Sequence, residues 1–242
     1  MNEPALPPLL PKVVLGVAAH PDDLDYYAGG AMAAFARQGA EVYYLVLTDG
    51  GKGSDDRTMT TEKLRDLRRD EQRKAATLLG VKEVFFCDFP DGELENTLDV
   101  KREVVKAIRR VKPDVVIALD PAVLYDPRQG FVNHPDHRAA GQAAVDAVYP
   151  LARDHMTFPE LLADGYEPHN TATLLLIGMG VTEPTYAVDI SNTLELKYQA
   201  LAAHGSQFSI QNMKEGIDRE SAKFGAPYGY RHAEPFTRID IA

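Results

Sequence analysis

The chain has 242 residues, of which 45% are hydrophobic, and its 36 acidic and 26 basic side chains give a net charge of −10. This size and apolar content suffice for one large domain with a buried core, whereas the acidic excess repels phosphate backbones and disfavours general nucleic-acid binding. The single cysteine, Cys87, excludes an intrachain disulfide framework and a Cys-rich zinc cluster, so any metal must be held by carboxylates and the 7 histidines.

Residues 1–12 are a Pro-rich leader that lacks the basic segment and apolar run of a signal peptide. The longest uncharged apolar stretches, Val13–Ala19 and Leu174–Val181, are far shorter than the roughly 20 residues that span a bilayer. We therefore expect a soluble, cytoplasmic protein with no membrane partner.

Strand and helix patterns alternate through the first half of the chain. Val13–Ala19 is continuously apolar, which is typical of a strand buried on both faces, and Gly29-Gly30 opens an Ala-rich helical pattern that runs to Gln38. The next expected elements are strands at Glu41–Leu47, Val84–Cys87 and Val115–Leu119 and helices from Thr61 to Gly80 and from Leu98 to Val111. This alternation predicts βαβ units that form a parallel sheet with helices on both faces.

The second half of the chain is less regular. A helix is expected after His134-Pro135, because proline is favoured at the first helical position. Beyond Pro150 the expected elements are strands at Thr173–Ile177 and Tyr186–Ile190 and a helix at Leu194–Ala203. No linker or low-complexity tract divides the chain, so we interpret residues 1–242 as one α/β domain in which residues 150–242 are a C-terminal elaboration.

Two His-Pro-Asp turns follow predicted strands and contain residue types suited to catalysis. One is the segment 20–23, His-Pro-Asp-Asp, and the other is the segment 133–137, Asn-His-Pro-Asp-His. Because ligands bind at the carboxyl ends of parallel strands, both turns are expected at one edge of the sheet. The phosphate-loop, dinucleotide-binding, nucleophile-elbow and HExxH motifs are missing, which disfavours the corresponding functions.

The spacing within the two turns suits a zinc centre. His20 and Asp23 are three residues apart, as are His134 and His137, so each pair presents its side chains on one side of a turn. Catalytic zinc takes three protein ligands and leaves a fourth position open for water. His20, Asp23 and one of the other two histidines can supply these ligands. Asp22 would then act as a general base, and the remaining histidine as an electrophile.

A simpler interpretation of each turn is that its central aspartate caps the helix that follows. The chain has two such turns, each after a strand and each with a metal-binding residue at its fourth position. This repetition favours a metal site over the interpretation that both turns are only helix caps. We expect His155 and His169 to lie at the surface, identify no partner for His232, and place Cys87 in the core.

With these residues the sequence resembles the LmbE-like (PIG-L-type) family of zinc-dependent N-acetylglucosaminyl deacetylases. The match covers both His-Pro-Asp turns and extends, in the family's order, over most of the chain. The further matching segments are Gly29-Gly30, Leu47-Thr48-Asp49-Gly50, Arg68/Arg69 with Glu71 and Leu79-Gly80-Val81, Pro90-Asp91-Gly92, Pro113-Asp114-Val115-Val116, and Lys197 with His204-Gly205-Ser206-Gln207. The resemblance implies a Rossmann-like, three-layer αβα fold with a mostly parallel sheet.

The resemblance also implies roles for individual residues. Three side chains would bind one zinc ion per chain, or another divalent metal in its place: His20, Asp23 and His137. Asp22 would be the general base, and His134 would be the electrophile or acid, oriented by Asp136. Arg68 would contact sugar hydroxyls, and His204 would line the pocket.

The sequence departs from the family's pattern at one point. The family usually has Glu one or two positions after the second Asp of the first turn, where this chain has Leu24-Asp25. Because the Asp25 side chain is one methylene shorter than that of Glu, the hydrogen bond that it makes is left open.

These assignments predict a metal-dependent N-deacetylase. Asp22 would activate the zinc-bound water for attack on the acetamide carbonyl of an N-acetylglucosamine unit, and zinc with protonated His134 would stabilise the oxyanion. The leaving amine can take its proton from His134 or from Asp22. The alternatives are an amidase acting on a larger acyl group, a thiol conjugate or an antibiotic conjugate, and a non-catalytic Rossmann-like binding protein. The expected partner is a small acetamido sugar, and the resemblance leaves its identity open and allows for a homo-oligomer.

Overall fold

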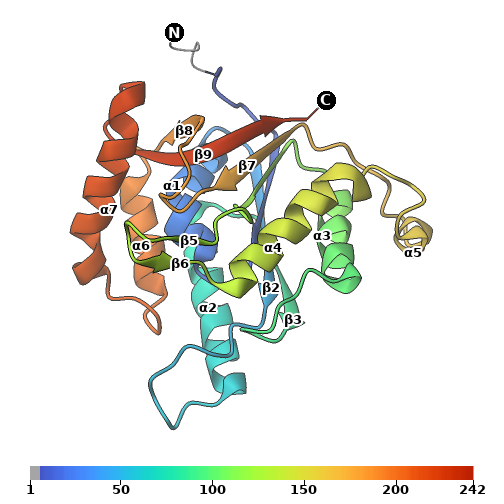
Figure 1. Cartoon of the computed structure of the whole chain (residues 1–242), viewed down its shortest axis with the longest axis horizontal. Helices are drawn as coiled ribbons and strands as arrows, with labels where there is room; N and C mark the ends of the chain where they lie inside the picture. Colours follow the sequence, from blue (N-terminus) through green and yellow to red (C-terminus); the bar gives the residue numbers. More distant parts are fainter. Residues whose placement is uncertain (1–5, 242) are drawn as a thin grey trace.

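A seven-stranded sheet forms the centre of the computed structural model, which describes residues 6–241 (Figure 1). From one edge to the other, the order is β3 (Glu83–Phe89), β2 (Glu41–Thr48), β1 (Val13–Ala18), β4 (Val115–Leu119), β7 (Thr173–Ile177), β9 (Ala233–Asp240) and β8 (Tyr186–Asp189). The first five strands pair in parallel, whereas β9 is antiparallel to both of its neighbours. The predicted mostly parallel sheet is therefore confirmed.

Helices cover both faces of this sheet and complete three layers (Figure 1). One face carries α1 (Asp23–Arg37), against which α2 (Thr61–Leu79) and α6 (Leu194–Ala203) pack, and α7 (Ile210–Gly225) lies beside α6 and β9. The other face carries α3 (Leu98–Val111) and α4 (Pro135–Asp146). No helix within residues 6–241 is both long enough and apolar enough to cross a membrane.

The core lies on both faces of the central strands. Alternate residues of β1 point to opposite sides: Val14 packs with the α1 layer, whereas Leu15 and Val17 pack with the α3 and α4 layer. Because helices cover both faces of the sheet, the side chains on both sides of β1 are buried. This explains why the strand is continuously apolar instead of alternating between apolar and polar residues.

Helix α1 begins earlier than the sequence pattern predicted. The expectation placed its start at Gly29, but the first helical residue is Asp23, and the Tyr26 amide already donates to the Asp22 carbonyl oxygen at 2.8 Å. The two acidic residues of the first turn, Asp23 and Asp25, favour the positive end of the helix dipole. Those polar residues made the first turn look like part of the preceding loop.

Several elements were missed because their patterns are short or mixed. The missed elements are the hairpin β5 (Tyr125–Asp126) and β6 (Phe131–Val132), the helices α5 (Pro159–Ala163) and α7, the short π-helical segment Ala147–Leu151, the short 3₁₀-helical segment Ala226–Tyr228, and strand β9. Strand β9 contains Pro235 and three charged residues, a composition that disfavours a strand inside a sheet, yet it lies between β7 and β8. Of the predicted leader, residues 1–5 lie outside the described chain, while Leu9 donates its amide to the Tyr186 hydroxyl at 2.9 Å.

A glycine sets how closely α4 approaches the sheet. A Cβ atom at Gly141 would overlap the carbonyl oxygen of Leu119, the last residue of β4. We expect Gly141→Ala to lower the free energy of unfolding by about 1–3 kcal/mol, the usual cost of overpacking. The matched control is Gly216→Ala on α7, where no heavy atom lies within 4 Å of the added methyl. Urea denaturation of both variants tests this, and equal stability of the two would contradict the close approach.

Candidate active site

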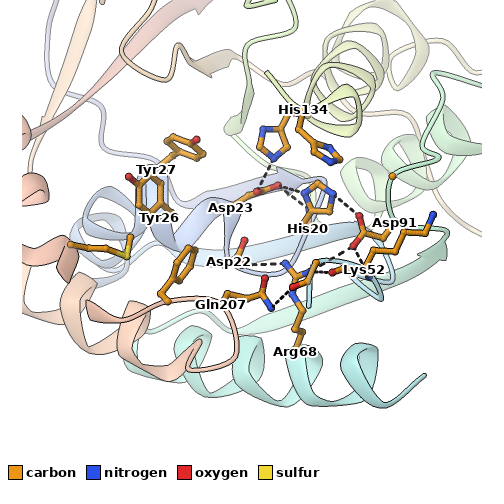
Figure 2. A pocket seen from close by; sticks show the side chains of 15 residues that line it. His20, Asp22, Asp23, Tyr26, Tyr27, Lys52, Arg68, Asp91, His134 and Gln207 are labelled. Atoms are coloured by element: carbon orange, nitrogen blue, oxygen red, sulfur yellow. Dashed lines mark hydrogen bonds and ion pairs between the residues drawn. The ribbon is translucent and has the colours of Figure 1, made fainter. Parts of the chain in front are cut away.

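A cavity of about 540 Å³ opens at the carboxyl edge of the sheet and contains most of the residues singled out from the sequence (Figure 2). The turn between β1 and α1, helix α2, the loop after β3 and the start of α4 all contribute to its wall. The titratable side chains that line it are His20, Asp22, Asp23, Tyr26, Tyr27, Lys52, Arg68, Asp91, His134 and His137. The two His-Pro-Asp turns are thus brought together, as expected for turns at one edge of a parallel sheet.

Asp23 links the two turns. Its Oδ2 atom accepts the backbone amides of Ala19 at 3.0 Å and His20 at 2.9 Å, and its Oδ1 atom lies 3.1 Å from His137 Nε2. His20 Nδ1 lies 3.6 Å from Asp23 Oδ2. Burial alone would raise the pKa of Asp23, but the charges of His137 and His20 hold it well below its usual range. The carboxylate is therefore anionic and faces one nitrogen of each histidine.

The other ring nitrogens of these histidines are bonded to the protein. His20 Nε2 lies 3.2 Å from Asp91 Oδ1 and 3.2 Å from Asp136 Oδ2, while His137 Nδ1 lies 3.1 Å from Asn133 Oδ1. These bonds fix the orientation of both rings. His20 Nδ1 and His137 Nε2 are left directed toward Asp23.

The Asp136 carboxylate does not lie where the sequence interpretation put it. Besides contacting His20, it accepts the amides of Gly92 at 2.7 Å and Leu94 at 3.1 Å, so it connects α4 to the loop after β3. The expectation that this side chain orients His134 is therefore wrong. The Asp136 backbone amide makes that contact instead, because it donates to His134 Nδ1 at 3.2 Å.

This hydrogen bond also defines the protonation state of His134, the residue that caps the N-terminus of α4. A ring whose Nδ1 accepts a hydrogen bond carries its proton on Nε2 and is neutral. Burial and the charge of neighbouring His20 lower the pKa of His134, which favours the same state. The ring lies edge-on to His20, with 4.7 Å between ring centroids. His134 is thus arranged to donate from Nε2 rather than to act as the imidazolium expected from the sequence.

Asp22 lines the same cavity as His134 and lies in a strained turn. Its φ of 95° is in the left-handed region, which is unusual for a residue other than glycine. The conformation is held from two directions: the Asp22 amide donates to Gln72 Oε1 at 2.8 Å, and Arg68 Nη2 donates to Asp22 Oδ2 at 3.1 Å. Burial raises the pKa of Asp22 to about 6, even though the charge of Arg68 opposes this shift. The side chain lines the cavity and has one oxygen committed to Arg68.

Arg68 was expected to contact sugar hydroxyls, but its terminal N–H groups are directed at the protein. Nη1 donates to the carbonyl oxygens of Gly50 at 2.9 Å and Lys52 at 3.3 Å, and Nη2 donates to Pro21 O at 2.9 Å as well as to Asp22. The residue is 5% exposed. Arg68 therefore lies at the cavity as predicted, but in this arrangement it fixes the Pro21-Asp22 turn.

The expectation that His204 lines the pocket is wrong. The residue is fully buried, and its Nε2 atom lies 2.7 Å from Asp25 Oδ2. Asp25 also accepts from Gln72 Nε2 at 2.7 Å and from the Tyr44 hydroxyl at 3.2 Å. Burial alone would lower the pKa of His204, but the hydrogen bond and charge of Asp25 raise it. Asp25, the residue that departs from the family's pattern, therefore has hydrogen-bond partners for its carboxylate. One of them, Gln72, also accepts the Asp22 amide.

Other expectations about single residues have mixed outcomes. His155 is exposed, as predicted, whereas His169 is half-buried and lies 2.8 Å through Nε2 from the Pro113 carbonyl oxygen. His232 has a partner that the sequence did not reveal, the Ser221 hydroxyl at 3.0 Å from Nδ1. Cys87 packs against the core, and burial raises the pKa of its thiol to about 12, so it is unreactive.

Sequence reasoning missed several cavity residues. Asp91 is 6% exposed and follows β3, so the same argument that selected the turns after β1 and β4 could have found it. Tyr26 and Tyr27 follow the first turn on α1, and Phe208 lies in the loop between α6 and α7. No motif marks these aromatic residues, because their role depends on which helix face meets the cavity.

The chemistry of this side-chain group fits a divalent cation. Four carboxylates, those of Asp22, Asp23, Asp91 and Asp136, are buried around the three imidazoles, and Arg68 is the one buried permanent cation among the residues that line the cavity. Such an excess of buried negative charge is costly without a counter-ion. Two sets have donor atoms close enough together to share a metal: His20 with His134 and His137, and His20 with Asp91 and Asp136. A metal can therefore be held here.

Comparison with known proteins identifies the family of this chain. Residues 15–148, more than half of the chain, match the family model PIG-L, described as GlcNAc-PI de-N-acetylase. The chain belongs to this family. The diacetylchitobiose deacetylase of Thermococcus kodakarensis is 35% identical over 227 residues, which are 92% of this chain and 81% of that protein. A probable N-acetyl-alpha-D-glucosaminyl L-malate deacetylase of Bacillus anthracis is 27% identical over 203 residues, 82% of each chain.

A solved structure extends the likeness to three dimensions. The N,N'-diacetylchitobiose deacetylase of Pyrococcus horikoshii, determined with its inhibitor MPG, superposes with a TM-score of 0.85 at 32% identity and covers 95% of this chain and 84% of that one. The predicted family, the three-layer α/β fold and the enzyme class are confirmed: this PIG-L family member is a hydrolase of the N-deacetylase type.

Proposed function

We propose that this PIG-L family enzyme hydrolyses the acetamide of a small molecule that contains N-acetylglucosamine, releasing acetate and a free amine. The observation that carries the proposal is the position of Asp22. It lies in a strained turn next to a set of metal-binding side chains, lines the same cavity, and has one oxygen that Arg68 does not bind. A base beside a metal site in a cavity of about 540 Å³ suits a metal-assisted hydrolysis of a sugar amide.

We assign the metal, zinc by preference, to His20 Nδ1, the Asp23 carboxylate and His137 Nε2. The opposite nitrogens of both rings are already bonded to Asp136 and Asn133, which is the arrangement that orients metal-binding histidines. The competing carboxylate Asp136 accepts two backbone amides and touches the far side of His20. When bound, the metal polarises the acetamide carbonyl and makes a water molecule more acidic.

The side chains around the metal position divide the proton chemistry between them. Asp22 takes the proton of the attacking water through its uncommitted oxygen and later gives it to the leaving amine. Neutral His134 donates Nε2–H to the oxygen of the tetrahedral intermediate, a contact of the kind that is worth about 3–4 kcal/mol in oxyanion sites. Because His134 Nδ1 is occupied by the Asp136 amide, the ring lacks the second proton that an acid would deliver, which favours Asp22 as the donor.

The relatives narrow the choice of substrate. The names of the two deacetylases at 35% and 32% identity specify diacetylchitobiose, and that of the 27% relative specifies an N-acetylglucosaminyl malate. We accordingly propose a small acetamido sugar, with diacetylchitobiose first. The apolar and aromatic wall formed by Tyr26, Tyr27, Phe208 and Met213 is suited to the faces of a sugar ring.

A substrate panel tests this function. Purified enzyme is incubated with N-acetylglucosamine, diacetylchitobiose and the malate and inositol glycosides of N-acetylglucosamine, with and without a chelator, and free amine and acetate are quantified. We expect equimolar amine and acetate from at least one sugar, abolished by the chelator and restored by added zinc. Release of a larger acid from acylated analogues, with no acetate from any sugar, would instead indicate an amidase, and no hydrolysis at all would indicate a binding protein.

A further inference from the structure

A second cavity of about 310 Å³ adjoins the one that contains the candidate metal site. Its wall is formed by the hairpin of β5 and β6, the loop after β7, one face of α7 and the start of β9. Tyr26 and Tyr27 line both cavities, and their rings meet edge to face with centroids 4.7 Å apart. Figure 2 shows these tyrosines on one side of Asp23, with Asp91 and Lys52 on the other side. The second cavity therefore continues the site past the tyrosines.

The lining of this second cavity includes a buried ion pair whose ammonium has N–H groups without a protein acceptor among the described residues. Lys197 Nζ donates to Glu234 Oε1 at 2.6 Å, and the two residues are 5% and 2% exposed. Glu234 also accepts the amides of Gly30 at 3.1 Å and Ala31 at 2.7 Å, so its carboxylate is well supplied with donors. An ammonium has three N–H groups, and Glu234 is its sole acceptor among the described residues. The remaining N–H groups can be satisfied by an acceptor in the cavity.

The rest of the lining indicates the chemistry of the occupant. Phe131 and Phe224 add to the two tyrosines as flat apolar surfaces, and the exposed Glu220 supplies a carboxylate that accepts from hydroxyl groups. The lining has two carboxylates, those of Glu220 and Glu234, and one ammonium, that of Lys197. This excess of negative charge disfavours an anionic occupant. Aromatic faces, a hydroxyl acceptor and a donor for a carbonyl or hydroxyl oxygen together suit a neutral acetamido sugar.

We propose that this cavity binds a second N-acetylhexosamine ring, so that the enzyme acts on an acetamido oligosaccharide whose reacting ring lies at the metal site and whose next ring lies beyond Tyr26 and Tyr27. This inference rests on the proposed deacetylase function and specifies its substrate. The Lys197 ammonium donates to an oxygen of the second ring, and Glu220 accepts from one of its hydroxyl groups. The preference for a disaccharide over a monosaccharide is then set by this cavity.

The test compares kcat/KM for N,N'-diacetylchitobiose with kcat/KM for N-acetylglucosamine, measured as free amine released. Glu220→Ala is expected to lower this ratio about three- to tenfold, as for a lost hydrogen bond, mainly through a higher KM for the disaccharide. Glu220→Trp, which fills the cavity from an exposed helix position, is expected to lower it by roughly tenfold or more. Glu215→Ala and Glu215→Trp are the matched controls, because Glu215 is exposed on the same helix and does not line the cavity.

The outcomes separate this inference from the function on which it rests. If the wild-type enzyme releases no amine from either sugar, the proposed function fails. If the enzyme is active but the ratio is unchanged in both Glu220 variants, or changes equally in the Glu215 controls, the second subsite is wrong. If the ratio responds to Lys52→Ala and not to Glu220→Trp, the second ring lies at the Lys52 side of the first cavity, and the inference is also overturned.

Discussion

Asp22→Asn is expected to lower kcat by roughly 10²–10⁴-fold, the usual contribution of a general base. Asparagine keeps the shape of the side chain and can occupy the same left-handed turn, but it cannot take a proton from water or return one to an amine. The Asp22 amide still donates to Gln72, so the turn stays in place. Metal content, measured by elemental analysis, is expected to stay close to that of the wild-type enzyme, because Asp22 is not among the proposed ligands.

The control for this substitution is Asp99→Asn, which changes an exposed carboxylate in the first turn of α3. It is expected to leave kcat unchanged. Wild-type turnover by Asp22→Asn on every active substrate would show that another group is the base. Loss of the metal together with activity would show that Asp22 contributes to metal binding.

His137→Ala is expected to abolish stoichiometric metal binding and, with it, measurable turnover. The substitution removes one of the three proposed ligands, and the position on α4 otherwise stays helical because alanine favours helices. Asp136→Asn is expected to weaken metal affinity by about 10–100-fold without abolishing it, since its carboxylate acts by holding the His20 ring. Metal titration of the chelator-treated proteins measures both effects.

This comparison discriminates between the proposed site, which contains His137, and the set of His20, Asp91 and Asp136. If the metal were held by His20, Asp91 and Asp136, then Asp136→Asn would lose it and His137→Ala would keep it. Exposed His155, replaced by alanine, is the control for removing an imidazole, and it is expected to bind metal as the wild-type protein does.

The fold was predictable where hydrophobic pattern alone determines structure. Buried strands such as β1 and β4 are continuously apolar, and α3 shows a strong apolar stripe, so their positions follow from the sequence. Strand β9 was not predictable in this way. Its Pro235 and its charged residues read as a loop, and its place between β7 and β8 is set by tertiary pairing with both of them.

The sequence predicted which turns meet at the site. It predicted less well which atoms of those turns contact one another. The parallel sheet brings His20, Asp23 and His137 together at one edge, as the two motifs implied. The roles of Asp136 and Arg68 depend on which backbone groups lie within reach of their side chains, namely the amides after β3 and the carbonyls of Pro21 and Gly50. Such contacts between distant loops leave no spacing pattern in the sequence.

The proposed metal site is tested most directly by locating the metal through anomalous X-ray scattering from crystals of the wild-type enzyme, recorded on both sides of the zinc absorption edge. We expect one peak, at about 2.0–2.2 Å from His20 Nδ1, an Asp23 oxygen and His137 Nε2, with Asp22 close by and unligated. A peak on the other side of His20, bonded to Nε2, Asp91 and Asp136, would contradict it.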